Sequence, residues 1–335
     1  MEYCHLTSSE RSQIYALKSI GCTQKKIASQ LKKSRSTISR EISRNSGDRG
    51  YRPKQAQKKA DDRRHLASSK PKKMNDELLA VIREKLLLDW SPEQISGWLC
   101  RAGIQISHES IYLFVWDDKR QGGKLYTHLR HAGKKYNKRG SGKAGRGCIP
   151  NRVDIDERPV AVERKERLGD WEGDTVIGAN HKGAILTLVD RKSKLSLFVN
   201  LEGKTSKEVN NGISERFDRL LEEYPRFDSL DQIARTITFD NGKEFSAHEA
   251  ITEELGVKCY FAKPYHSWER GLNEHTNGLL RQYYPKKTDF TKLSDEKTQW
   301  IENRLNDRPR KVLNYMTPRE VFMGKRQPTP VALQC

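Results

Sequence analysis

The segment WEGDTVIG at residues 171–178 is followed closely by AILTLVD at 184–190 and LSLFVNL at 195–201. Polar and apolar residues alternate in the first segment, which is typical of a strand with two different faces. The second segment is almost wholly apolar, which is typical of a strand buried inside a sheet. The sequence therefore predicts three neighbouring strands.

Helices and strands alternate after this point. The hydrophobic pattern predicts a helix over 206–224, a strand over 235–239, a helix over 247–255, a strand over 257–261, and helical segments from Leu272 onward. Three neighbouring strands followed by such an alternation are the order of a ribonuclease-H-like mixed sheet with helices on both faces. We therefore expect an α/β domain over residues 151–335.

Acidic residues stand at two places where a sheet of this kind binds ligands. Asp170, Glu172 and Asp174 alternate along the first strand and project from one face. Asp240 follows the 235–239 strand at its carboxyl end, where ligands gather in open mixed sheets. Acids at strand ends are also commonly just solvated, so both interpretations stay open on these residues alone.

A third acid, Glu274, lies on the predicted helix beyond Leu272, with Asn277 and Arg281 on its face. Three carboxylates suit phosphodiester transfer, in which two divalent cations about 3.5 to 4 Å apart activate the attacking oxygen and stabilise the leaving one. Oxygen ligands favour Mg²⁺ or Mn²⁺. Arg281 is then a candidate phosphate contact with Asn277, or a partner of a surface acid.

The amino-terminal residues predict a helix-turn-helix. Thr7 and Glu10 form a capping box, Thr23 caps a second short helix, and a third helix covers about 34–44. Because the apolar residues of the third helix face the core, its hydroxyls and arginines face outward and can reach bases and phosphates. These candidate DNA-binding residues are Arg35, Ser36, Thr37, Ser39, Arg40 and Arg44. A solvated basic helix face is the alternative.

The charge is concentrated at the front of the chain. Of the formal net charge of +19, residues 1–150 carry +18 and residues 151–335 carry +1. A polyanion-binding front end joined to a nearly neutral domain fits this partition, and the expected polyanion is nucleic acid. A uniformly basic enzyme does not fit it.

A weaker repeat follows the first helix-turn-helix. Ser91 and Ile95 repeat the spacing of Thr23 and Ile27, and residues 107–111 repeat 34–38. The predicted organisation is an all-α helix-turn-helix domain over 1–50, a basic arm and a second helix-turn-helix-like unit over 51–131, a basic glycine-rich linker over 132–150, and the α/β domain. The second unit can serve packing or DNA contact.

Several classes of protein are disfavoured. The aliphatic stretches are far shorter than a bilayer span and Glu2 interrupts any signal core, so we expect a soluble intracellular protein without membrane partners. The six cysteines show no paired spacing for a disulfide framework or zinc site. His128 and His131 have no CxxC partner, so the zinc site of a retroviral-type integrase is not expected.

Long blocks of the sequence also resemble the bacterial insertion-sequence transposases of the IS-thirty family. The resemblance is carried, in order, by HLTSSERSQI, RSTISREISRN, GYRPKQAQ, GDWEGDTVIG, LTLVDRKS, TFDNGKEF, PYHSWERGLNEHTNGLLRQYYPK and LNDRPRKVL. The blocks extend over nearly the whole chain. They are far more specific than an isolated set of three acids.

The resemblance implies a DDE transposase whose catalytic and metal-binding residues are Asp174, Asp240 and Glu274, the last two separated by 33 residues. It implies about two Mg²⁺ or Mn²⁺ ions per site, cleavage and strand transfer at the inverted-repeat ends of double-stranded DNA, and a second DNA as target. One acidic trio must serve two element ends, so we expect at least a homodimer on DNA, in the bacterial cytoplasm at the nucleoid. The alternatives are a non-catalytic DNA-binding regulator derived from a transposase, and another enzyme of the same fold.

Overall fold

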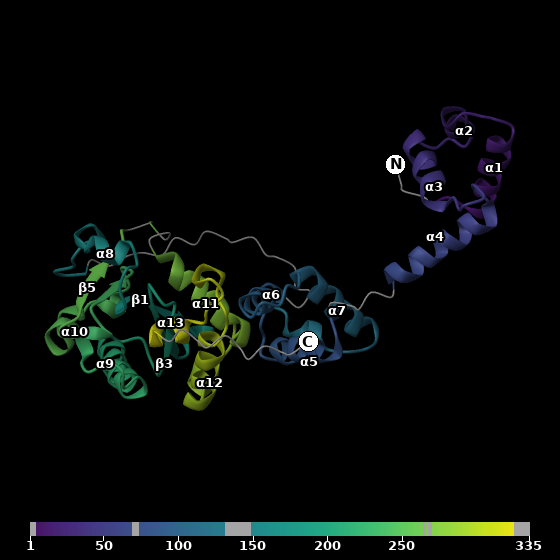
Figure 1. Ribbon diagram of the computed structural model, residues 1–335. Coiled ribbons are helices and arrows are strands. Elements are labelled where there is room, and N and C mark those ends of the chain that lie inside the picture. The colour runs from purple at the N-terminus through teal and green to yellow at the C-terminus, as the bar shows by residue number, and fades with distance from the viewer. Residues whose placement is uncertain (1–4, 69–73, 131–148, 264–265, 267–269, 325–335) are drawn as a thin grey trace. The chain divides into compact units, whose positions relative to one another are not determined.

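The computed structural model describes residues 5–68, 74–130, 149–263, 266 and 270–324 (Figure 1). The chain divides into two compact units, Met1–Asn75 and Asp76–Cys335. Most of the predicted linker over 132–150 lies outside the described residues. None of the described helices combines the length and the apolar character that a membrane crossing needs.

The described residues of the first unit form the helices α1 (Ser8–Ser19), α2 (Gln24–Gln30), α3 (Arg35–Asn45) and α4 (Pro53–Ser68). Both predicted caps are present, with Thr7 and Glu10 in a reciprocal capping box and the hydroxyl of Thr23 accepting from the first turn of α2. The hydroxyl of Ser34 caps α3 in the same way. The apolar faces of these helices meet in one core built on Ile14, Ile27 and Ile38. The predicted helix-turn-helix is confirmed.

The basic segment after α3 forms the helix α4, which packs against α1 and α3. Tyr51, Ala56 and Ala60 are buried there, so the small residues of this segment form a contact face while its lysines and arginines remain at the surface. The unit that carries α3 therefore extends beyond the three-helix motif.

The second unit begins with α5 (Asp76–Leu87), α6 (Pro92–Arg101) and α7 (His108–Arg120). Ser91 and Ser107 cap α6 and α7, and the apolar residues of the repeat, Ile95 and Ile111, are fully buried. The spacing that predicted a second helix pair is therefore matched by two capped helices.

These helices contact the rest of their unit around Asp89, between α5 and α6. One carboxylate oxygen of Asp89 lies 2.8 Å from Nδ1 of His128, and the other accepts a 2.9 Å hydrogen bond from the hydroxyl of Tyr283. Arg304 donates to the backbone carbonyl of Leu87. His128 thus has a structural partner, and His131 lies outside the described residues.

A five-stranded mixed sheet forms the centre of the second unit, in the order β3-β2-β1-β4-β5. The strands are β1 (Asp170–Ile177), β2 (Ala184–Asp190), β3 (Ser196–Leu201), β4 (Thr236–Phe239) and β5 (Lys258–Phe261). The first three are antiparallel, and β4 and β5 run parallel to β1. Each predicted strand is confirmed to within one residue at either end.

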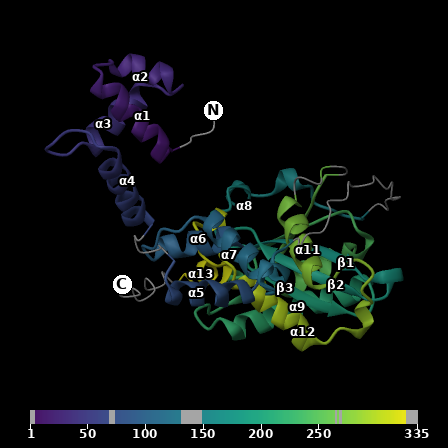
Figure 2. The same ribbon diagram turned by 90° about the vertical axis from the view of Figure 1, so that its right-hand side faces the viewer.

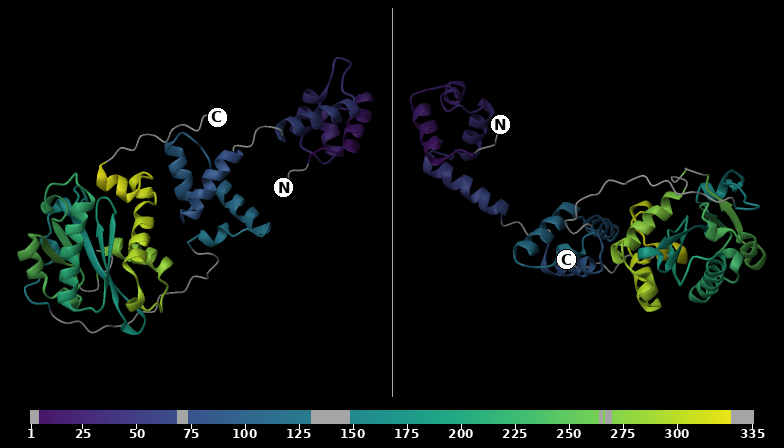
Figure 3. Two further views of the ribbon diagram at one scale, coloured as in Figure 1. Left: turned by 90° about the horizontal axis from the view of Figure 1, so that it is seen from below. Right: turned by 180° about the vertical axis from the view of Figure 1, so that it is seen from behind.

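Helices cover both faces of this sheet (Figure 3). Trp171 on β1 belongs to a core shared with α9 (Ser206–Glu223) and α10 (His248–Leu255) on one face. Val176 belongs to a second core, shared with α11 (Gly271–Tyr283) and α12 (Asp295–Asn306), on the other. The described part of the unit also contains the short helices α8 (Val160–Glu163) and α13 (Pro318–Met323). Strand order, directions and two-sided helical cover are those of a ribonuclease-H-like fold.

Candidate active site and DNA-binding surface

The two candidate aspartates meet because their strands are parallel neighbours. Glu172 lies opposite Thr238 in the β1–β4 pair, so Asp174 and Asp240 each follow by two residues at the same edge of the sheet. Asp174 is half-buried, and the side chain of Asp240 is 38% exposed. The strand register therefore places two carboxylates side by side at an accessible edge.

The guanidinium of Arg270 joins these carboxylates. Its Nη2 donates to Oδ2 of Asp240 over 3.2 Å, and its Nη1 lies 3.6 Å from Oδ1 of Asp174. Burial raises the pKa of the Asp174 carboxyl, Arg270 opposes the rise, and the charge of Asp240 adds to it. Two acids are thus held close together at a point where a single guanidinium contacts both of them.

Hydrogen bonds fix the orientation of each carboxylate. Oδ1 of Asp174 accepts from the backbone N–H of Thr175 over 2.9 Å, and its Oδ2 accepts from Nδ2 of Asn277 over 2.8 Å. Oδ1 of Asp240 accepts from the backbone N–H of Gly242 over 2.8 Å. Asn277 comes from α11, which lies beside β1 and β2 (Figure 2), so this bond ties the helix to the first aspartate.

Glu274 stands one turn before Asn277 on α11, and its residue is exposed. The spacing of three places both side chains on one face of the helix. Within the described residues, no group of three or more His, Cys, Asp or Glu side chains is close enough to hold a metal ion. The structure therefore brings Asp174 and Asp240 together, with Glu274 on a neighbouring helix face and outside that pair.

Arg281 has partners of its own. Its Nη2 donates to the backbone carbonyl of Ile177 at the end of β1 over 2.8 Å, and its guanidinium lies 5.2 Å from the ring centre of Phe290. These contacts connect α11 to the sheet. The side chain therefore has a packing role whether or not it also reaches a phosphate.

The other two acids of the first strand have structural roles. Asp170 is buried and accepts from Arg167, and Glu172 is buried in an ion pair with Arg191, whose Nη1 lies 2.5 Å from its Oε1. Buried charges need such partners to offset the loss of hydration. Only Asp174 of the three is left to face the site.

Two residues at the site were not predicted as functional. Arg270 precedes Glu274 by one helical turn, and this spacing was the available signal. Glu244 follows Asp240 by four residues in the block TFDNGKEF, and its Oε1 accepts from the hydroxyl of Thr175, next to Asp174. Arg270 contacts Asp174 and Asp240, and Glu244 contacts Thr175, so each contact joins residues far apart in the chain. The spacing can point to the residue but does not show the contact.

The helix α3 presents the residues expected to contact DNA. Ile38 and Ile42 face the core, and Thr37 is half-buried with its hydroxyl 2.8 Å from that of Ser34. The remaining candidates are exposed: Arg35, Ser36, Ser39, Arg40 and Arg44. The outward face is therefore made of short hydroxyls and arginines, which suit a major groove.

Comparison with known proteins agrees with this arrangement. Residues 2–45 match a family model described as a helix-turn-helix domain. A transposase for insertion sequence element IS4351 of Bacteroides fragilis is 46% identical, covering 95% of each chain. The transposase InsI for insertion sequence element IS30A of Escherichia coli is 38% identical over 95% of this chain and 83% of that protein.

A solved structure, the catalytic core domain of BIV integrase, covers 47% of this chain and 94% of its own, with 20% identity and a TM-score of 0.34.

A helix-turn-helix domain followed by a ribonuclease-H-like sheet with paired aspartates defines a class of DNA-processing enzymes. This chain belongs to the IS30 family of insertion-sequence transposases. The resemblance noted in its sequence is confirmed.

Proposed function

We propose that this transposase binds the terminal inverted repeats of an insertion sequence and cuts and joins DNA strands there. Its proposed catalytic residues are Asp174, Asp240 and Glu274. The observation that carries the catalytic part is the pair of carboxylates on adjacent parallel strands, Asp174 within β1 and Asp240 just after β4, sharing one guanidinium. A buried acid pair with a structural role would be closed off from solvent, whereas the side chain of Asp240 is 38% exposed.

The side chains at this edge fit a hard divalent cation. The atoms with which Asp174 and Asp240 could bind a metal are all carboxylate oxygens. The positive guanidinium of Arg270 between them indicates that the pair attracts a cation. We propose that these aspartates, with Glu274, hold Mg²⁺ or Mn²⁺ as a two-ion site, which would activate the attacking oxygen and stabilise the leaving one.

The neighbouring residues on α11 would then orient the reacting groups. Asn277 orients Asp174 by a direct hydrogen bond from its Nδ2, and its Oδ1 accepts from the hydroxyl of Thr187, so its place as a proposed phosphate contact rests on its position beside Asp174. Arg281 is the other proposed phosphate contact. Its hydrogen bond to Ile177 engages only one of its two terminal nitrogens, which leaves the second for a phosphate oxygen.

Recognition of DNA is assigned to the exposed face of α3. We propose that it contacts double-stranded DNA through Arg35, Ser36, Thr37, Ser39, Arg40 and Arg44. Each protomer carries one acidic trio while two element ends are processed, so the proposed assembly is at least a homodimer on DNA. It would act on both the element and a target DNA, in the bacterial cytoplasm at the nucleoid.

The test uses the purified full chain, a duplex carrying the element's own ends, and Mg²⁺. The variants Asp174→Asn, Asp240→Asn and Glu274→Gln should each lower strand cleavage by more than about 1,000-fold, because each removes a proposed ligand charge. End binding should stay unchanged. The matched control is Asp218→Asn, an exposed acid on α9, which should cleave like the wild type.

Binding of the ends without any cleavage by the wild-type protein would contradict the catalytic assignment. That outcome would instead support a DNA-binding regulator. Full cleavage by Glu274→Gln would move the third ligand to another acid.

A further inference from the structure

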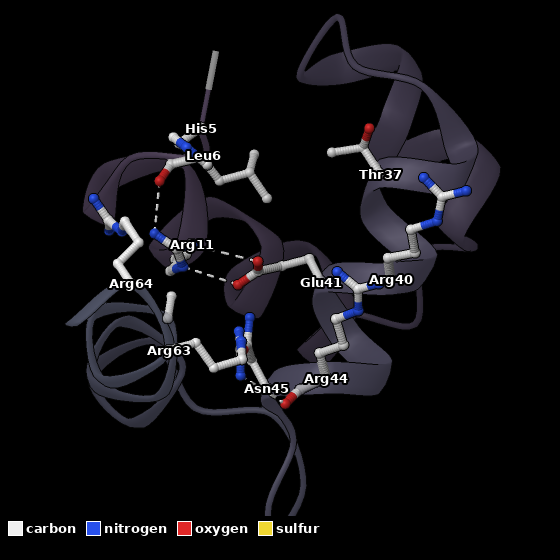
Figure 4. A pocket seen from close by; sticks show the side chains of 11 residues that line it. His5, Leu6, Arg11, Thr37, Arg40, Glu41, Arg44, Asn45, Arg63 and Arg64 are labelled. Carbon is white, nitrogen blue, oxygen red and sulfur yellow. Dashed lines mark hydrogen bonds and ion pairs between the residues drawn. The ribbon is translucent and has the colours of Figure 1, made fainter. Parts of the chain in front are cut away.

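A cavity of about 280 Å³ lies between α3 and α4 in the first unit (Figure 4). Its walls come from the segment before α1, from α1, from the flank of α3 and from α4. The lining includes four arginines besides the buried Arg11: Arg40, Arg44, Arg63 and Arg64. Two of these belong to α4, which lies beyond the residues 2–45 that match the helix-turn-helix model.

The one acid in the lining is already neutralised. Glu41 is buried, its Oε1 lies 2.8 Å from Nε of Arg11, and it also accepts from the hydroxyl of Tyr51 over 3.1 Å. Arg63 donates only to neutral oxygens, Oδ1 of Asn45 and the carbonyl of Arg44. Within the described part of the chain, no acidic side chain forms an ion pair with Arg40, Arg44 or Arg63, so the cavity has an excess of positive charge.

A buried donor in the same wall lacks a partner. Asn45 is 1% exposed, and its Nδ2 has no hydrogen-bond partner among the described residues. The bond from Arg63 to Oδ1 fixes which end of the amide carries the hydrogens. Burial of an unsatisfied donor is unfavourable, so this amide indicates a place for an acceptor that the protein itself does not supply.

The cavity borders the proposed DNA-reading face. On a helix of 3.6 residues per turn, Ser36 and Ser39 point away from the core, while Arg44 lies on the flank next to α4. When such a helix enters a major groove, its flank faces the sugar-phosphate strand at the groove edge. The ligand that matches position, charge and donors is a phosphate.

We propose that this cavity binds one phosphate of the DNA backbone beside the groove that α3 enters, with Arg44, Arg63 and Asn45 as donors. This inference rests on the proposed DNA recognition by α3 and adds a site on α4 to it. The arginines fit phosphate oxygens because they can donate two parallel hydrogen bonds. A phosphate contact sets the register of α3 and adds affinity without sequence preference.

The test compares Arg63→Gln with Lys58→Gln in the full chain. Lys58 is exposed on the same helix and does not line the cavity, so both variants remove one positive charge from α4. Arg63→Gln should weaken binding to an element end and to a random duplex alike, by about tenfold, and reduce the salt dependence by about one charge. Lys58→Gln should weaken binding less than about threefold.

A backbone substitution identifies the phosphate. Single phosphates of the end duplex are replaced in turn by neutral methylphosphonates, and each duplex is measured with wild type and Arg63→Gln. One replacement should weaken the wild type yet have no further effect on Arg63→Gln, because both changes remove the same contact. Arg63→Lys should recover the salt dependence and part of the affinity, which separates loss of contact from loss of folding.

Equal effects of Arg63→Gln and Lys58→Gln, or coupling to no single phosphate, would overturn the proposed site while leaving recognition by α3 intact. Stabilisation of the DNA-free wild type, but not of Arg63→Gln, by inorganic phosphate without such coupling would assign the cavity to a free anion and also overturn it. Failure of the wild type to prefer the element's ends would contradict the proposed function itself.

Discussion

The helix pairs α2–α3 and α6–α7 are built from the same local signals but present different chemistry. Both second helices begin after a serine cap, Ser34 and Ser107, and bury an isoleucine four residues later. When the caps are aligned, Arg40 of α3 corresponds to Leu113 of α7, and Arg44 corresponds to Asp117. Caps and buried spacing therefore determine that a helix pair forms, while the outward residues determine what it can contact.

The surroundings of the two pairs differ in the same way. Residues 1–75 contain 19 basic and 6 acidic side chains, and α3 leaves serines and arginines exposed. The outer face of α7 instead exposes Tyr112, Leu113 and Trp116, and its helical unit is joined to the sheet through Asp89. We infer that the first pair reads DNA and that the second mainly belongs to the catalytic half.

The largest effect is expected from removing the first unit. A chain of residues 76–335 should lose its preference for the element's ends, a fall of about 1,000-fold or more in specific affinity. The reason is that the exposed face of α3 and most of the excess charge are absent. Fluorescence anisotropy with end and random duplexes measures this change. End binding equal to that of the full chain would assign recognition to α7 and reverse the comparison.

Much of the fold that this prediction uses could be predicted from the sequence. The strands were found to within a residue because alternation in β1 is typical of an extended chain and the apolar run of β2 reports its burial directly. The meeting of Asp174 and Asp240 follows from the ribonuclease-H-like strand order, because the strand that carries Asp174 pairs with the strand that ends just before Asp240. These are local patterns, or consequences of one known topology.

Contacts between distant residues could not be predicted in this way. Nothing in the spacing shows that Arg270 joins both aspartates, or that Glu172 is neutralised by Arg191 and so leaves the site to Asp174. The charge of the basic arm likewise does not show that Ala56 and Ala60 turn one side of α4 into a packing face. Packing partners depend on tertiary structure, which a single sequence pattern does not encode.

A smaller effect is expected when Arg40 of α3 is replaced by leucine, the residue at the corresponding position of α7. The variant Arg40→Leu should weaken binding to the element's ends by about 10 to 100-fold, the range for one lost base contact by an arginine. Binding to random DNA should fall less, because part of the lost contact is specific. Titrations with both duplexes at one salt concentration measure the ratio. An equal loss on both would make Arg40 a phosphate contact only.

The smallest effect is expected from the reverse exchange, Leu113→Arg in α7. Leu113 is 67% exposed, so this substitution should change the free energy of unfolding by less than about 0.5 kcal/mol. Affinity for the element's ends should change by less than about threefold, since a charge that lies off the DNA acts only through a screened field. Thermal unfolding and the same anisotropy titrations measure both quantities.

This exchange is informative because a tenfold gain in affinity would break the comparison. An added arginine strengthens binding strongly only where it meets a phosphate or a base edge, so such a gain would place α7 on DNA. Glu109 and Asp117 argue against that, because they put negative charges where α3 has Ser36 and Arg44. If affinity does not rise, the exposed apolar face of α7 has no part in DNA recognition. The +18 charge of residues 1–150 then attracts DNA mainly through the first unit.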